Sequence, residues 1–162
     1  MGVERNTRRA TSHAKEGSRR RLRRDLKEVA REHTTLAVEL HAAGRYVMAH
    51  YVAGLAVECI LRAYQSRISP VFSGRHDLQA LYRDAQFASV VSPGEEQKVT
   101  AALTEVARRW SNSHRYRSER ALRLFLRRAN LGQTGKFVRE SSRRIVDAAI
   151  VIVDQGVLRW TV

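Results

Sequence analysis

The chain has 162 residues, which suits one domain with a hydrophobic core and is short for two. Hydrophobic residues make up 43%, and no apolar run approaches the roughly 20 residues that cross a bilayer, so we expect a cytoplasmic protein without a membrane partner. Thirty Lys and Arg against 16 Asp and Glu give a net charge of +14, which favours a polyanionic partner such as nucleic acid, although arginine-rich codon usage would produce the same excess.

The first 20 residues are polar and basic without a periodic pattern, so we expect a flexible basic arm at 1–20 and a single helical domain at 21–162. From Leu22 to Ala43 apolar residues recur at steps of four and three, which predicts a helix with one apolar seam. Gly44 is expected to end this helix with a short turn, so that the next helix packs antiparallel to it.

Residues 45–67 are apolar on nearly every side, which predicts a central helix buried by several neighbours. His50, Gly54, Glu58 and Arg62 follow at steps of four and form a predicted polar seam. Glu58 and Arg62 are placed to pair, and Gly54 leaves room for another backbone to approach. Cys59 is the only cysteine and is expected to be a buried structural thiol.

The rest of the chain predicts further helices, five to six in all. A break is expected over 69–74, then a short helix from His76 to Phe87 that His76 and Asp77 cap. Ser92, Pro93 and Glu95 have the pattern of a capping box before a helix that reaches Trp110. Ser118 is expected to cap a helix to Ala129, and a last helix from Lys136 is expected to end before Gly156.

The connector from Arg108 to Arg117 concentrates side chains that suit a phosphodiester. Arginine can hold a phosphate, histidine can exchange a proton near neutral pH, and an aromatic ring can stack on a base. A surface connector with this composition and no chemistry is also common. No glycine-rich phosphate loop and no cluster of metal ligands is present, so we expect no cofactor and no metal.

Three stretches, GRYVMAHYVAGLAVECILRAY, RHDLQALYRDA and RRWSNSHRYRS, resemble the HEPN domain (higher eukaryotes and prokaryotes nucleotide-binding), and the resemblance covers about Leu22 to Asn130. It implies an antiparallel helical bundle, commonly a homodimer, and in many members a metal-independent endoribonuclease. Arg109 and His114 match the family's arginine and histidine signature at its shortest spacing, with Arg108 at the next. Tyr116 resembles the tyrosine that a partner nucleotidyltransferase antitoxin modifies in toxin members.

By that resemblance His114 would assist attack of the 2′-hydroxyl and Arg109 would stabilise charge on the phosphoryl oxygens. Trp110 departs from the pattern, because catalytic members usually have a polar residue there. The first hypothesis is therefore an RNA- or nucleotide-binding protein of HEPN type, an RNase toxin or phage-defence component with Arg109, His114 and Tyr116 at its site. The second is a non-catalytic helical interaction module with a basic nucleic-acid-binding surface. The expected nucleic-acid contacts are Arg108, Arg115, Arg117, Arg120, Arg123 and Arg127.

A third hypothesis is a DNA-binding helix-turn-helix protein. The strip formed by Arg120, Arg123 and Arg127 would supply half of the basic recognition face that such a protein needs.

Overall fold

The structure is a computed structural model that describes residues 3–69, 76–132 and 136–160, with side chains from residue 16 onward. The described residues are helical and contain no strand, which confirms the predicted all-α class. The helices are α1 (Val3–Ala42), α2 (Tyr46–Ile68), α3 (Leu78–Asp84), η1 (Phe87–Ser89), α4 (Glu96–Arg109), η2 (Asn112–Tyr116), α5 (Glu119–Arg128) and α6 (Phe137–Leu158), where η marks a 3-10 helix.

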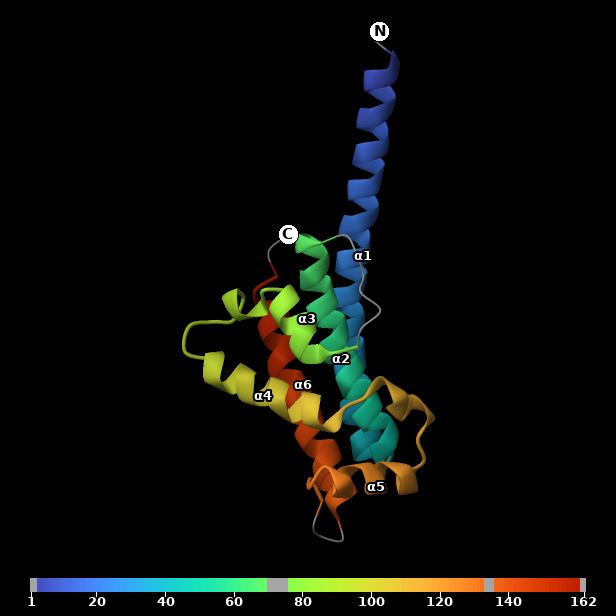
Figure 1. Cartoon of the computed structure of the whole chain (residues 1–162), viewed down its shortest axis with the longest axis vertical. Helices are drawn as coiled ribbons and strands as arrows, with labels where there is room; N and C mark the ends of the chain where they lie inside the picture. Colours follow the sequence, from blue (N-terminus) through green and yellow to red (C-terminus); the bar gives the residue numbers. More distant parts are fainter. Residues whose placement is uncertain (1–2, 70–75, 133–135, 161–162) are drawn as a thin grey trace.

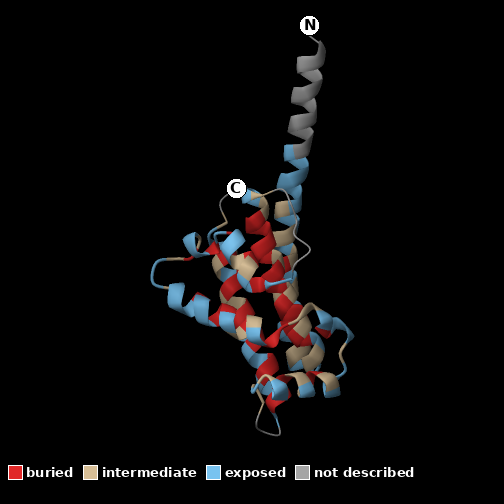
Figure 2. Cartoon of the chain, viewed as in Figure 1, coloured by how far each residue is buried: buried red, intermediate tan, exposed pale blue. Residues whose placement is uncertain are grey.

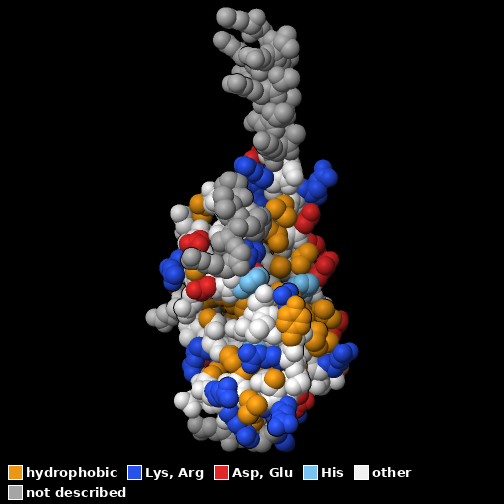
Figure 3. Space-filling view, turned by 45° about the vertical axis from the view of Figure 1, so that its right-hand side comes forward, with side chains coloured by type: hydrophobic (Ala, Val, Ile, Leu, Met, Phe, Trp, Pro, Cys, Tyr) orange, Lys and Arg blue, Asp and Glu red, His pale blue; other side chains and the backbone are white. Residues whose placement is uncertain are grey.

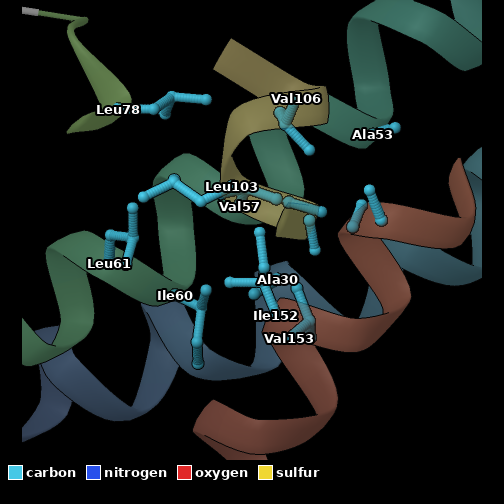
Figure 4. Close-up of a cluster of buried hydrophobic side chains, with 14 of the residues drawn as sticks. Ala30, Ala53, Val57, Ile60, Leu61, Leu78, Leu103, Val106, Ile152 and Val153 are labelled. Atoms are coloured by element: carbon cyan, nitrogen blue, oxygen red, sulfur yellow. The ribbon is translucent and has the colours of Figure 1, made fainter. Parts of the chain in front are cut away.

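Three long helices, α1, α2 and α6, run along the long axis of the molecule and pack against one another (Figure 1). Helix α4 lies across α6, α3 packs on α2, and α5 crosses the lower end of the bundle in this view. The main core forms where α1, α2, α4 and α6 meet (Figure 4). Ala30, Val57, Val106 and Ile152 are fully buried there.

Helix α2 is the central helix that the sequence predicts, and buried residues follow most of its length (Figure 2). By length and composition alone it is the one helix among the described residues that could also cross a membrane. In the fold, 61% of its most apolar stretch is buried inside the bundle. Packing on several sides therefore accounts for its apolar composition.

Helix α1 begins at Val3, so the structure does not confirm the flexible arm expected over residues 1–20. Between Val3 and Arg20 the chain has one glycine and no proline, and its alanines, arginines and glutamates are strong helix formers. The low hydrophobicity of this stretch suggested an arm because the stretch has little apolar surface to bury. Helix formation here depends instead on the intrinsic helix propensity of its residues.

The seam of α1 is also shifted from the predicted one. Ala30 and Ala37 are buried, whereas Leu22 and Leu36 are each 41% exposed. Leu22 and Leu36 were expected at the seam because they follow its steps of four and three. Small side chains at Ala30 and Ala37 let α1 lie close to its neighbours, and this turns the larger leucines toward the edge of the contact.

Two of the predicted ends of the longer helices are wrong. Helix α6 continues through Gly156 to Leu158, because this glycine serves close packing: a Cβ there would overlap Ile60, and the Tyr64 hydroxyl donates to the Gly156 carbonyl at 2.7 Å. Helix α4 begins at Glu96 without a capping box. Gly94, with φ of +87°, takes the preceding residues out of the helical conformation, and the Ser92 hydroxyl instead accepts from Arg159 at 3.0 Å.

Helix α3 also ends earlier than predicted, at Asp84 and not at Phe87, and His76 contacts Glu58 while Asp77 alone caps the helix. The remaining helix ends agree with the sequence to within a residue or two. Gly44 follows α1 with φ of +75°, and Ser118 accepts from the Ala121 N–H at the start of α5. Asp77 caps α3 by accepting from the N–H groups of Gln79 and Ala80, both at 3.0 Å. Helix α2 ends at Ile68, and the break expected over 69–74 lies largely outside the described residues.

Two consecutive serines of α6 join it to both of the other long helices. Ser141 lies 3.3 Å from Nε2 of His50 on α2, and Ser142 lies 2.9 Å from Nδ1 of His41 on α1. Both serines are buried. Their small side chains allow close approach of the three helices, and their hydroxyls satisfy polar atoms at the contact.

Candidate nucleic-acid interface

Trp110 fixes the start of the connector between α4 and α5. Its indole packs against Gly54 of α2 so closely that a Cβ at Gly54 would overlap it, and its Nε1 donates to the Tyr51 carbonyl at 3.0 Å. The space at Gly54 is thus filled by a side chain, whereas another backbone was expected there. The residue that departs from the family pattern is an anchor of the core, 6% exposed.

His114 lies in the 3-10 helix η2, and this short helix turns its ring inward. The ring is 1% exposed and packs edge-on against Phe125 with ring centres 4.8 Å apart. Neither ring nitrogen has a hydrogen-bond partner. Burial, with a smaller contribution from Arg117, lowers the pKa of His114 to about 4, so the ring is neutral at physiological pH.

His50 of α2 lies beside His114, with ring centres 5.4 Å apart. It is fully buried, and its Nδ1 also lacks a partner. Burial, then the nearby His114 and Arg109, lower the pKa of His50 to about 3. The sequence places His50 on the central helix and His114 in a connector, and no spacing rule indicates that two residues 64 positions apart will meet.

Arg109, the second predicted catalytic residue, ends α4 with a side chain that is 4% exposed. Its Nη1 lies 2.7 Å from Oε2 of Glu105, while its buried Nε has no partner. Burial lowers the pKa of this guanidinium, and Glu105 opposes that shift. Arg109 is therefore a buried, ion-paired group, and the pair with Glu105 compensates much of the cost of burying its charge.

Arg109 lines a cavity of about 340 Å³ between the end of α4 and the start of α6, and Arg108 and Arg144 lie on the same walls. His114 is not part of this lining, and Tyr116 is 79% exposed. The three predicted catalytic residues thus share no cavity, because the connector directs His114 toward the core and Tyr116 toward solvent. As placed, the imidazole of His114 cannot reach a substrate without movement of η2.

A second cavity of about 260 Å³ lies between the end of α1 and the first turns of α6. Lys136, Arg139 and Arg143 line it together with His41, and Glu140 belongs to both cavities. None of these basic side chains was among the predicted nucleic-acid contacts. The sequence does place four cations, Lys136, Arg139, Arg143 and Arg144, within nine residues, and this was the available sign of a basic helix start.

The predicted nucleic-acid contacts from α4, η2 and α5 lie around the same end of the molecule. Arg108, Arg115 and Arg120 are exposed. Arg117 and Arg127 lie over aromatic rings, Arg117 at 5.0 Å from Phe125 and Arg127 at 5.6 Å from Phe137.

Arg123 also lies over Phe137, at 5.6 Å, and forms an ion pair of 2.6 Å with Glu119. Lys and Arg side chains gather at this lower end of the surface (Figure 3).

The predicted polar seam of α2 divides into two separate groups. Glu58 and Arg62 form a buried ion pair of 2.7 Å, and His76 joins them, with Nδ1 2.9 Å from the Glu58 carboxylate. His50 belongs to the histidine pair described above. In the described part of the chain no three His, Cys, Asp or Glu side chains are grouped to hold a metal ion.

We call the described residues from Arg108 to Arg144 the basic end. This stretch contains twelve Lys and Arg against two acids. By fold and surface the chain is an all-helical bundle with a strongly basic end. No family model, no curated protein and no solved structure matches it.

Proposed function

We propose that the protein binds nucleic acid, with RNA as the first candidate, by placing its basic end on the phosphate backbone. The observation that carries this proposal is the concentration of charge, since twelve cations against two acids in one stretch form a field that attracts a polyanion. Phosphate neutralisation releases counterions and supplies most of the affinity of such surfaces.

Contacts with aromatic rings support the same proposal. Arg115 lies 4.6 Å from the ring centre of Tyr116, and Arg117 and Arg127 lie over Phe125 and Phe137. A guanidinium that already lies on a ring loses less conformational entropy when it binds. These side chains are therefore partly ordered before a phosphate arrives.

The burial of His114 favours binding without cleavage. General acid or base catalysis requires a ring nitrogen within hydrogen-bond reach of the substrate, and both nitrogens of His114 are enclosed. The resemblance to HEPN proteins is what favours RNA over DNA. The family's ribonuclease activity, the homodimer and a nucleotidyltransferase partner acting on Tyr116 stay predictions. The 79% exposure of Tyr116 would leave its hydroxyl accessible to such a partner.

Charge reversal tests the binding surface. The Arg120→Glu, Arg127→Glu double variant is compared with Arg31→Glu, Arg83→Glu, which changes the net charge equally but lies on α1 and α3. We expect the first to bind a mixed-sequence RNA at least about tenfold more weakly, with a salt slope shallower by about 1 to 2. Equal losses in the two variants, or no loss in either, would contradict the proposal.

A cleavage assay tests the distinction between binding and catalysis. We expect wild-type protein to leave mixed RNAs intact over hours at low salt while a mobility shift shows binding. Cleavage that disappears in His114→Ala and in Arg109→Ala, with binding retained, would instead establish the ribonuclease. Light scattering on the same samples measures whether the predicted homodimer forms.

A further inference from the structure

A wide groove lies between α1 and the ends of α2 and α6. Figure 1 shows that these helix ends lie at the opposite end of the bundle from α5. The groove has a volume of about 740 Å³ and we call it the Trp160 groove. Its lining includes Glu16 as the one acid and the cations Arg20, Arg21, Arg23, Arg24, Lys27 and Arg67. No residue of this groove belongs to the proposed RNA-binding surface.

Trp160 belongs to the lining of the groove and contacts residues of two helices. Its ring packs edge-on against Tyr64 at 4.9 Å, which ties it to the core of α2. The Arg67 guanidinium lies 4.7 Å from the indole centre, and the Lys27 ammonium lies 5.9 Å from it. Cation–π contacts therefore hold positive groups from two different helices over one indole.

The charges in the groove are far from balanced. Glu16 accepts from Arg23 at 2.9 Å and lies 3.7 Å from Arg20, and the Arg23 hydrogen bond lowers the pKa of its carboxyl. One carboxylate cannot neutralise the five cations that α1 contributes to the groove. Like charges gathered in this way repel one another and destabilise the compact state unless an anion binds between them. Most of these arginines lie outside the packed face of α1, whose buried positions are Ala30 and Ala37. Arg20, Arg21 and Arg24 are exposed, whereas the Arg23 side chain is 17% exposed and packs against its neighbours.

We propose that the Trp160 groove binds a ligand with consecutive phosphate groups, supplied either by a nucleic-acid strand or by a free polyphosphate. From Arg20 to Lys27 the cations span two turns of α1, about 10 Å along the axis, and Arg67 faces them from α2. Five of the six cations are arginines, whose forked donors suit phosphate oxygens. Neighbouring phosphates match this charge density better than carboxylates carried on separate side chains.

The test uses the full chain, in which Trp110 and Trp160 are the only tryptophans. Inorganic tripolyphosphate and a twelve-nucleotide oligouridylate are each titrated in about 100 mM salt, and tryptophan emission is recorded. We expect a saturable change, because a bound phosphate draws Arg67 and Lys27 away from the Trp160 ring. The change should vanish in Trp160→Phe, which keeps Trp110.

Variants separate this site from the basic end. Arg20→Glu, Arg24→Glu should weaken the ligand-dependent change at least tenfold, and Arg120→Glu, Arg127→Glu should leave it unaltered. If both ligands give a saturable emission change, a free polyphosphate is sufficient for binding in the groove. If only the oligonucleotide gives one, the ligand of the groove is a nucleic-acid strand. Circular dichroism of each variant verifies that α1 remains helical.

Three results would overturn the inference: no emission change with either ligand, an unchanged response in Arg20→Glu, Arg24→Glu, or tighter binding of polyglutamate than of tripolyphosphate. RNA binding that depends on Arg120 and Arg127 would survive each of these results. The two proposals therefore fail separately.

Discussion

At the scale of single residues, the polar atoms around the connector are unusual because several are buried without partners. They are Nδ1 of His50, both ring nitrogens of His114 and Nε of Arg109. A buried polar atom without a hydrogen bond costs on the order of 1–3 kcal/mol. The packing of Trp110, Phe125 and the surrounding core must offset this cost, so the connector is held by apolar contacts despite its polar sequence.

The histidine pair predicts a loss of stability in mild acid. The pKa of His50 and His114 in the fold, about 3 and about 4, lies below the ordinary value of 6.5. As the pH falls below about 6.5 the unfolded chain takes up protons that the fold excludes, so the free energy of unfolding should decrease steadily toward pH 4. Urea denaturation at a series of pH values measures this decrease.

Substitution of His114 tests whether this histidine causes the loss of stability in acid. His114→Phe should remain as stable as wild type at pH 7. Between pH 6.5 and 4 its free energy of unfolding should decrease less than that of wild type, and the difference between the two decreases should be as much as about 3 kcal/mol. Tyr116→Phe, at the exposed neighbouring position, should keep the wild-type profile. Identical pH profiles for His114→Phe and wild type would contradict the assignment.

Gly54 gives a second prediction at this scale. Gly54→Ala should lower the free energy of unfolding by about 1–3 kcal/mol, since its methyl group would displace the Trp110 indole from α2. Urea denaturation measures the loss, and a red shift of Trp110 emission would report the displacement. Gly17→Ala is the matched control: nothing lies within 4 Å of a Cβ there, so it should leave stability equal or slightly raised. Equal effects at both positions would exclude close packing as the cause.

At the scale of helices, side-chain caps matter most where the helix is short. Helix α3 has seven residues, and Asp77 satisfies two of its first N–H groups. Asp77→Ala should therefore cost about 1 kcal/mol in urea denaturation. Asp84→Ala, at the other end of α3, should cost nothing, because a carboxylate there opposes the helix dipole. A loss at Asp84 as large as that at Asp77 would argue against capping.

The sequence predicts most helix ends at which one local rule decides the outcome, and the capping box expected at Ser92 is the exception. The apolar composition of α2, the cap at Ser118 and the positive φ at Gly44 each identify one element. Predictions are wrong where tertiary packing decides. Gly156 has the pattern of a helix end but serves contact with Ile60, and the seam of α1 depends on how closely its neighbours approach.

The candidate site could be predicted only in part for the same reason. A cluster of arginines is visible in the sequence, and these residues do lie at one end of the molecule. The direction in which a connector turns His114 depends on contacts with Phe125 and α2, which no local pattern encodes. The Trp160 groove joins residues 20–27, Arg67 and Trp160, which become neighbours only through the packing of α1, α2 and α6.

At the scale of the whole molecule, the excess of positive over negative charge is confined to two parts of the chain. Residues 1–24 contain nine cations against two acids and residues 108–144 twelve against two, while the remainder contains nine cations against twelve acids. Repulsion should therefore act mainly within each part. Its range of about 10 Å at 0.1 M salt corresponds to about two turns of a helix, so each cation is repelled mainly by its near neighbours in the same part.

Salt should stabilise the protein as a result. Between about 20 and 300 mM sodium chloride we expect the free energy of unfolding to rise by roughly 1 kcal/mol, or the Tm by about 2–4 °C. Arg120→Glu, Arg127→Glu should show a smaller rise and a higher Tm at low salt. Calorimetry measures both, and a Tm that falls as salt is added would contradict this account.

The adjacent serines of α6 fix how that helix is rotated about its own axis. Ser141 and Ser142 point about 100° apart, one toward His50 and the other toward His41. Turning α6 in either direction would break at least one of these contacts and bury an unpaired hydroxyl or imidazole. Two small polar side chains thereby select one rotational setting from the many that an apolar helix surface would tolerate.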